Sequence, residues 1–322
     1  RLRAGARTYF SHNDLWRIEG YTAYGFRDQK WKYGFEGRYM FNRENRATIG
    51  FGGRNDVIQL GAQLTNDDGI MNRSFASSSI FSSGSNSSLS WLRQNNLFFS
   101  IEPVKNFQVR LDASLQNIKS ANPTKFNLDF YKNGELKSET NDFHTTFSLI
   151  AKPGAKYSQY GVDRYEFTTL SPVFVLKFTH GFENVLKGDF DYNKLQFLYS
   201  QPIILGNYGK TIINFEAGKN FNTVPLALQN IIPGNQSYNL IPGTFALLKY
   251  YEFVADAYST LNIEHHFNGK LISYLPLIKK LKMRELVFFR GAYGTLSEVS
   301  KNINFENKLY SAPDQKIYYQ YG

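Results

Sequence analysis

The sequence contains no cysteine, which excludes a disulfide framework and any chemistry that depends on a thiolate. It also has no run of about 18 uninterrupted apolar residues, so helices that span a membrane are excluded. Aromatic residues, in contrast, make up 16% of the 322 residues, with 22 tyrosines and 28 phenylalanines. The fold has to account for this aromatic content.

Histidine is scarce, and its positions do not suggest a metal site. The five histidines are His12, His144, His180, His265 and His266. No two of them have the spacing, with a carboxylate beside them, that a zinc site needs. In the run Glu264-His265-His266, the alternation of a strand points the two histidines to opposite faces. We therefore predict no metal site, no cofactor and no catalytic residue.

Long stretches of the chain alternate between apolar and polar residues. Residues 16–26, 31–41 and 107–116 each place aromatic or aliphatic side chains on one face and charged side chains on the other. Soluble sheets also alternate, but their strands have about five or six residues. The runs here last about ten residues and carry aromatics near their ends, which is typical of transmembrane β-strands. The residues predicted to face lipid include Trp31, Phe35, Tyr39, Val109 and Leu111.

The lengths of the connections support the same architecture. Short turns at 11–14, 43–45 and 103–106 alternate with long polar loops, as in outer-membrane barrels. The sequence thus predicts an all-β fold, a transmembrane antiparallel β-barrel that forms a single domain over residues 1–322, incomplete at both ends. The alternative is a soluble β-domain. About twelve strands are expected, at residues 1–10, 15–28, 31–42, 45–54, 92–103, 106–119, 142–152, 172–181, 189–200, 209–219, 253–268 and 283–296.

The chain carries a net charge of +10, but its lysines and arginines are scattered along strands and turns instead of being clustered. This distribution disfavours nucleic-acid binding. The basic charge suits a barrel among anionic lipids of a bacterial outer membrane, where lipids and lipopolysaccharide are the expected partners.

Residues 209–296 resemble the C-terminal part of the BamA-type surface-antigen barrels, which are sixteen-stranded insertases and translocases of Gram-negative outer membranes. A long segment, 220–252, precedes Asp256 and Tyr258, and strand-like runs follow at 261–267 and 287–294. The chain is also similar to an uncharacterised branch with an N-terminal carboxypeptidase-regulatory-like domain. That resemblance rests on NDV at 55–57, EFVAD at 252–256 and EHHFNG at 264–269. It implies that about twelve of sixteen strands are represented here.

The resemblance also suggests how the long segment is held. In the resembled barrels a loop arginine pairs with an aspartate on a strand, whereas here Asp256 stands at the loop position and Arg290 at the strand position. We expect a charge-swapped pair of Asp256 with Arg290, next to Tyr258. The alternative is that Asp256 stays solvated and Arg290 pairs with Glu264. The apolar runs within 220–252 further predict that this segment folds back into the barrel.

The function expected from the resemblance is a non-enzymatic accessory or scaffold in the assembly or export of envelope proteins, in a complex with other such proteins. A pore or uptake barrel is the first alternative. A barrel-embedded hydrolase is the second, and it would require His144 and His180 to meet near an inward-facing serine or acid.

Overall fold

The computed structural model describes residues 1–11, 13–26, 28–58, 60, 88–167, 170–235, 243–249, 251–274, 283–304 and 316–322. In this part of the chain, thirteen strands form one antiparallel sheet, and their order in the sheet follows their order in the sequence. The strands are β1 (Leu2–Arg7), β2 (Trp16–Gly25), β3 (Lys30–Asn42), β4 (Ala47–Ile58), β5 (Ser90–Val104), β6 (Phe107–Ser120), β9 (Glu139–Ala151), β12 (Val173–Gly181), β13 (Tyr192–Ile204), β14 (Lys210–Asn220), β17 (Ala257–His266), β18 (Leu286–Thr295) and β19 (Tyr318–Tyr321). Among the described residues, no helix combines the length and the apolar character that crossing a membrane requires.

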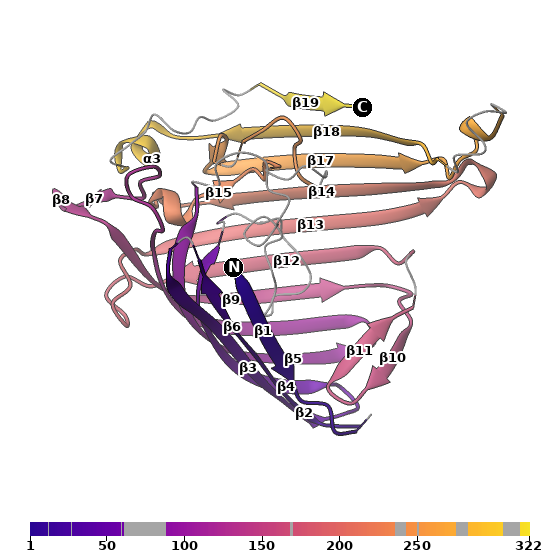
Figure 1. Cartoon of the computed structure of the whole chain (residues 1–322), viewed down its shortest axis with the longest axis horizontal. Coiled ribbons are helices and arrows are strands. Elements are labelled where there is room, and N and C mark those ends of the chain that lie inside the picture. Colours follow the sequence, from indigo (N-terminus) through magenta and orange to yellow (C-terminus); the bar gives the residue numbers. More distant parts are fainter. Residues whose placement is uncertain are drawn as a thin grey trace.

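The sheet is strongly curved, and its first strands bend round toward the viewer in Figure 1. The two outermost strands, β1 and β19, are not paired with each other in the described part, so the sheet is not closed. Three small two-stranded sheets accompany it in the described part. They are β7 (Phe130–Lys132) with β8 (Glu135–Lys137), β10 (Tyr157–Tyr160) with β11 (Asp163–Glu166), and β15 (Asn230–Ile231) with β16 (Val254–Ala255).

The connections differ between the two ends of the sheet. At one end, here called the short-turn end, lie the turns 43–46 and 105–106 and the connection 205–209, which contains a 3₁₀ turn, Gly206–Tyr208. At the other, long-loop end, β6 is joined to β9 through β7 and β8, and β14 to β17 through β15 and β16. A second 3₁₀ turn (Leu226–Leu228) and the short helix α3 (Glu298–Asn302) also belong to long-loop connections, and a third (Ile272–Tyr274) belongs to the short-turn end.

The predicted all-β fold is confirmed, and each of the twelve expected strands corresponds to a strand of the large sheet. Two features were not expected. The sheet has a thirteenth strand, β19, in the described part, and the stretch between β9 and β12 forms the hairpin of β10 and β11. The total of sixteen strands in the intact protein stays a prediction.

The prediction that segment 220–252 folds back is confirmed for its described residues. Val224 and Leu228 are buried against Leu92 of β5, Ile118 of β6 and Tyr192 of β13, within one hydrophobic cluster. Farther along, Ile232, Phe245 and Leu248 form a second cluster with Ala292 of β18. The inner side of the sheet at the long-loop end is therefore filled by the chain's own apolar side chains.

This packing predicts a difference between two substitutions in the same stretch. Phe245 is fully buried, whereas Leu247 is 79% exposed. Phe245→Ala should lower the free energy of unfolding by about 3–5 kcal/mol, because it leaves a cavity in the core. Leu247→Ala, an exposed control, should stay within about 0.5 kcal/mol. Urea unfolding of the protein reconstituted in lipid vesicles measures both, and equal effects would show that the segment is not packed against the sheet.

Candidate functional site

The two faces of the sheet differ sharply in polarity. On β3, Trp31 is 67% exposed and Phe35 42%, whereas Glu36, the residue after Phe35, is only 3% exposed. On β6, Leu111 is 51% exposed and Arg110 is 9% exposed. Tyr39 is exposed and Val109 is half-buried on the same outer face. These five predicted residues thus point away from the inner side, while their contact with lipid stays a prediction.

Asp256 lies where the long connection from β14 joins β17, and it holds three segments together. Its carboxylate accepts hydrogen bonds from the side chain of Gln229 (3.0 Å), the backbone N–H of Ser297 (2.8 Å) and the hydroxyl of Ser300 (2.7 Å). Its own N–H donates to the carbonyl of Thr295. Asp256 is therefore neither paired with an arginine nor left in solvent; it ties the folded-back segment to the start of α3.

The predicted charge-swapped pair of Asp256 with Arg290 is wrong. The fully buried Arg290 guanidinium forms an ion pair with Glu264 (2.6 Å) and also donates to the carbonyl of Thr244. The physical reason is the strand register. Arg290 lies opposite Asn262, and Glu264, two residues further along β17, is on the same face of the sheet as Asn262. Six residues of strand, roughly 20 Å, separate Asp256 from the partner position of Arg290.

Arg290 nevertheless fastens the folded-back segment, because Thr244 belongs to that segment. The mechanism differs from the predicted one, since the arginine contacts a backbone carbonyl and not an aspartate. Tyr258, predicted as the aromatic residue of the loop, is instead the second residue of β17. Its hydroxyl donates to Glu216 on the neighbouring strand β14.

The histidines are distributed over separate places. His265 faces Thr211 (2.8 Å) and the carbonyl of Tyr208 (2.9 Å), while His266 lies 3.9 Å from Glu264. His144 is paired with Asp142 at 2.6 Å on the inner face. Within the described residues no group of three or more metal-binding side chains comes together. His12 lies outside the described residues.

His144 and His180 do not meet. The strand register places His180 opposite Thr145, so the alternation of side chains puts the two histidines on opposite faces of the sheet. His180 contacts Asn193 instead, at 2.9 Å. The pair that a barrel hydrolase would have needed is therefore not formed.

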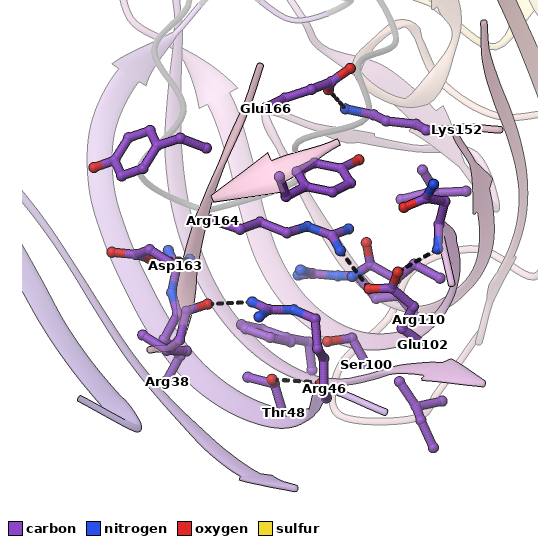
Figure 2. A pocket seen from close by; sticks show the side chains of 18 of the residues that line it. Arg38, Arg46, Thr48, Ser100, Glu102, Arg110, Lys152, Asp163, Arg164 and Glu166 are labelled. Carbon is purple, nitrogen blue, oxygen red and sulfur yellow. Dashed lines mark hydrogen bonds and ion pairs between the residues drawn. The ribbon is translucent and has the colours of Figure 1, made fainter. Parts of the chain in front are cut away.

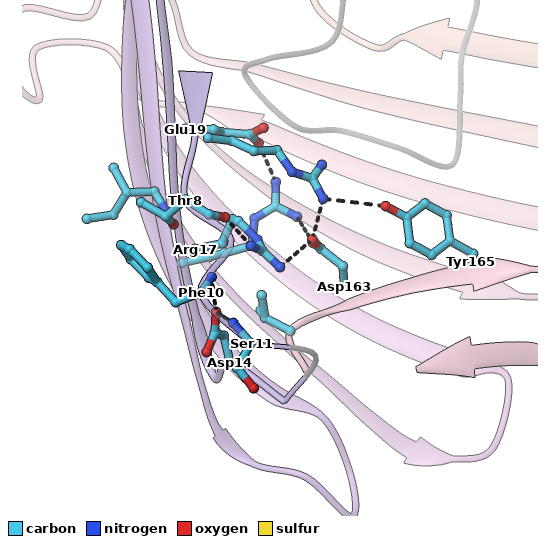
Figure 3. A network of polar contacts seen from close by, with 12 residues as sticks. Thr8, Phe10, Ser11, Asp14, Arg17, Glu19, Asp163 and Tyr165 are labelled. Atoms are coloured by element: carbon cyan, nitrogen blue, oxygen red, sulfur yellow. Dashed lines mark hydrogen bonds and ion pairs between the residues drawn. The ribbon is translucent and has the colours of Figure 1, made fainter. Parts of the chain in front are cut away.

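A second element crosses the inner side at the short-turn end. The hairpin of β10 and β11, at the lower right of Figure 1, is held to strands far away in sequence by the side chain of Asp163. The Asp163 carboxylate lies 2.8 Å from the guanidinium of Arg7, 2.9 Å from that of Arg17 and 3.8 Å from that of Arg38. Figure 3 shows Arg17 directed at this carboxylate.

The backbone next to Asp163 is held as well. The N–H of Val162 donates to the carbonyl of Asp14 (2.8 Å), and the carbonyl of Val162 accepts from Arg46 (2.8 Å). Asp14 is itself fixed in its turn, since its carboxylate accepts from the N–H groups of Ser11 and Phe10 at 2.9 Å each. Those hydrogen bonds, that of Ser11 first, lower the pKa of Asp14.

Between the hairpin and the sheet lies a cavity of about 500 Å³ (Figure 2). Its wall carries both signs of charge, much of it in ion pairs. Arg164 is paired with Glu102 (2.5 Å) and Lys152 with Glu166 (2.9 Å). Arg46 projects into the same space, where burial first and the charge of Arg164 second lower its pKa. The cavity is therefore polar, and it is covered by the hairpin.

Sequence reasoning missed this second element. The stretch YSQYGVDRYEF, residues 157–167, does contain a recognisable hairpin pattern, because polar and aromatic residues alternate around a glycine. Gly161 lies at the turn with φ of +59°, a conformation that favours glycine. The ion pairs of Asp163 join residues more than 120 positions apart, and no local pattern reveals them.

Comparison with known proteins assigns the chain to a family. A family model described as "Family of unknown function (DUF5686) C-terminal domain" matches residues 1–298. The chain belongs to this family. Among solved structures, the DUF5686 C-terminal domain is similar to BamA from Haemophilus ducreyi lacking POTRA domains 1-3, with 12% sequence identity and a TM-score of 0.45. The match covers 91% of this chain and 57% of that one, so the chain spans little more than half of that structure.

The search of curated proteins gave no match. The carboxypeptidase-regulatory-like domain that was expected ahead of the DUF5686 C-terminal domain stays a prediction.

The buried pair of Arg290 and Glu264 leads to a prediction about stability. Removing either partner of this pair should cost about 3–5 kcal/mol, because the other charge is left buried and unpaired. In a double-mutant cycle of Arg290→Met and Glu264→Gln, the double variant should lose much less than the sum of the single variants. Denaturant unfolding in lipid vesicles measures the cycle.

The control is the pair of Lys301 and Glu298, in which the side chain of Glu298 is 78% exposed. Glu298→Gln should change the free energy of unfolding by no more than about 1 kcal/mol. Additive effects of Arg290→Met and Glu264→Gln would refute the coupling.

Proposed function

We propose that this domain is an outer-membrane β-barrel whose inner space is occupied by the chain itself, and that it acts as an accessory or scaffold in the assembly or export of envelope proteins. The observation that carries the membrane part is the inverted polarity of the sheet. Large aromatic and aliphatic side chains are exposed on its outer face, while arginines and carboxylates are buried on its inner face. A sheet in water would gain from the opposite arrangement, whereas in lipid only the outer face has to be apolar.

The orientation follows from the connections. Outer-membrane barrels have short turns on the periplasmic side and longer loops outside the cell. In this proposal the short-turn end, with the hairpin of β10 and β11, faces the periplasm. The folded-back segment between β14 and β17 then enters from the extracellular side.

The filled interior favours a scaffold function and disfavours a pore. At the long-loop end, Val224, Leu228 and their neighbours form a hydrophobic cluster with the sheet. At the short-turn end, the hairpin lies across the inner face and is fastened through Asp163. An uptake barrel needs a continuous polar passage, and both ends here are obstructed by ordered chain.

The assembly or export role is supported by the resemblance of residues 209–296 to BamA-type barrels. Outer-membrane lipids, lipopolysaccharide and other envelope proteins are the partners that this role implies. Identification of the proteins that copurify with the intact protein from native membranes tests it. Recovery of envelope assembly or export components supports the role, and recovery of the protein alone after crosslinking in cells would oppose it.

The filled interior predicts the behaviour in planar bilayers. The reconstituted domain should show no large, steady open current, because both plugging elements remain in place. Deletion of residues 155–167, which removes the hairpin, should leave the conductance low, since the folded-back segment still obstructs the other end. Large, stable currents from the unaltered chain would refute the scaffold proposal and indicate a pore.

The outer face yields a test of the membrane setting. Leu111→Arg should reduce the free energy of unfolding in lipid vesicles by roughly 2–4 kcal/mol if residue 111 lies near the bilayer midplane, and by less near an interface. Leu136 on β8 is equally exposed, at 50% against 51%, but belongs to a hairpin outside the large sheet. Leu136→Arg should therefore have little effect, and a similar loss in both variants would show that the outer face does not contact lipid.

A further inference from the structure

The two elements that occupy the inner side are held by different forces. The folded-back segment contributes Val224, Leu226, Leu228 and other apolar residues to a buried cluster. The hairpin of β10 and β11 is fastened mainly by charges and backbone polar groups, through Asp163, Arg164 and Val162. Detaching a segment from a hydrophobic cluster exposes apolar surface to water, which is unfavourable. Ion pairs and hydrogen bonds can be exchanged for equivalent ones offered by another molecule.

The sheet residues that hold the Asp163 carboxylate form a defined binding site. Arg7 of β1 and Arg17 of β2 come from adjacent strands and pair with one carboxylate, and Arg38 of β3 lies 3.8 Å from it while pairing more closely with Glu19 and Glu36. The side chain of Arg17 is only 1% exposed, and it also donates to the carbonyl of Thr8. A buried arginine cannot lose its carboxylate partner without a large penalty. Release of the hairpin is therefore favoured when another carboxylate takes the place of Asp163.

The site also recognises a peptide backbone. The residue before the aspartate, Val162, donates its N–H to Asp14 and offers its carbonyl to Arg46. The complete set of contacts thus binds the backbone N–H and carbonyl of one residue, followed by an acidic side chain. A free phosphate would satisfy the arginines but would leave the Asp14 carbonyl without a donor.

We propose that Arg7, Arg17 and Arg38, together with the carbonyl of Asp14 and the guanidinium of Arg46, form a binding site for an acidic peptide segment, which the hairpin occupies as an internal stand-in. An incoming segment with a suitably placed aspartate displaces Asp163, releases the hairpin and uncovers the cavity of about 500 Å³ beneath it. This inference deepens the scaffold function, on which it rests for the source of the segment. The site itself is tested with purified protein and does not require that function.

The first experiment measures binding in trans. The probe is a fluorescent synthetic peptide with the sequence of residues 155–167, and the control is the same peptide carrying Asp163→Asn. The intact protein in lipid nanodiscs should bind the first peptide weakly, because its own hairpin competes, and should not bind the second. Binding of both peptides alike, or of neither to any form of the protein, would overturn the proposal.

Removal of the internal competitor sharpens this measurement. In the protein variant Asp163→Asn, affinity for the aspartate-containing peptide should rise at least tenfold. Glu166→Gln is the matched control, because it removes one negative charge from the same hairpin but from a pair with Lys152, outside the arginine cluster. It should leave the affinity unchanged. An equal rise in both variants would indicate a general charge effect and refute the site.

The second experiment follows the hairpin itself and needs no change at the site. Because the protein has no cysteine, two spin labels can be placed at Gln159→Cys on β10 and Glu44→Cys in the turn after β3, both exposed positions. Added peptide should move a large part of the population to a longer distance between the labels. Inorganic phosphate at the same ionic strength should not.

An unchanged distance at peptide concentrations that saturate binding would refute displacement of the hairpin. Equal displacement by phosphate would show that the arginines accept any oxyanion, which would refute recognition of a peptide. This measurement stands even if Asp163→Asn fails to fold. A negative result with the peptide also leaves the copurification test of the scaffold function unaffected, so the two failures are distinguishable.

Discussion

The sheet turns its aromatic and aliphatic side chains outward, so the charged residues that alternate with them face one another on the inner side. Those charges that are buried on this face have been removed from bulk water and need a partner. Arg110 is paired with Asp112 at 2.7 Å, and Arg38 with Glu36 at 2.8 Å, both between residues two positions apart on one strand. The remaining features of the structure depend on which groups pair with the buried charges that have no such partner two positions away.

The folded-back segment and the hairpin of β10 and β11 supply such partners at opposite ends of the sheet. Arg290 has a carboxylate partner on the neighbouring strand, and its further donor is taken by a carbonyl of the folded-back segment. Arg17 shares its strand and face with Glu19, but Glu19 is paired with Arg38 at 2.9 Å, and the hairpin supplies Asp163 to Arg17. The inserted elements therefore complete the pairing of the inner face and occupy its space by the same contacts. An empty interior would leave Arg17 without the Asp163 carboxylate and Arg290 without the Thr244 carbonyl.

The large sheet was predictable from sequence because its determinants are local. Alternation over about ten residues and the positions of short turns located all twelve expected strands, and the apolar runs near 224–232 and 240–251 indicated that the segment folds back. The short strand β19 was missed because four residues, Tyr318–Tyr321, give too little alternation to recognise. The hairpin was missed for another reason. Its pattern is visible, but its place on the inner face is decided by contacts between Asp163 and residues 7, 17 and 38.

The fate of the predicted pair of Asp256 with Arg290 shows the limit of transferring a contact by analogy. Residue types at matching motif positions suggested the pair, yet the partner of a strand residue is fixed by register. Asn262 lies opposite Arg290, which brings Glu264 within reach and leaves Asp256 near the end of the strand. There Asp256 finds backbone and hydroxyl donors, Ser297 and Ser300, at the start of a short helix. The long segment is thus tied down at two separate points, by Asp256 at its exit and by Arg290 through Thr244 in its interior. Loss of one contact leaves the other in place, which is a more robust attachment than the single ion pair that the resemblance implied.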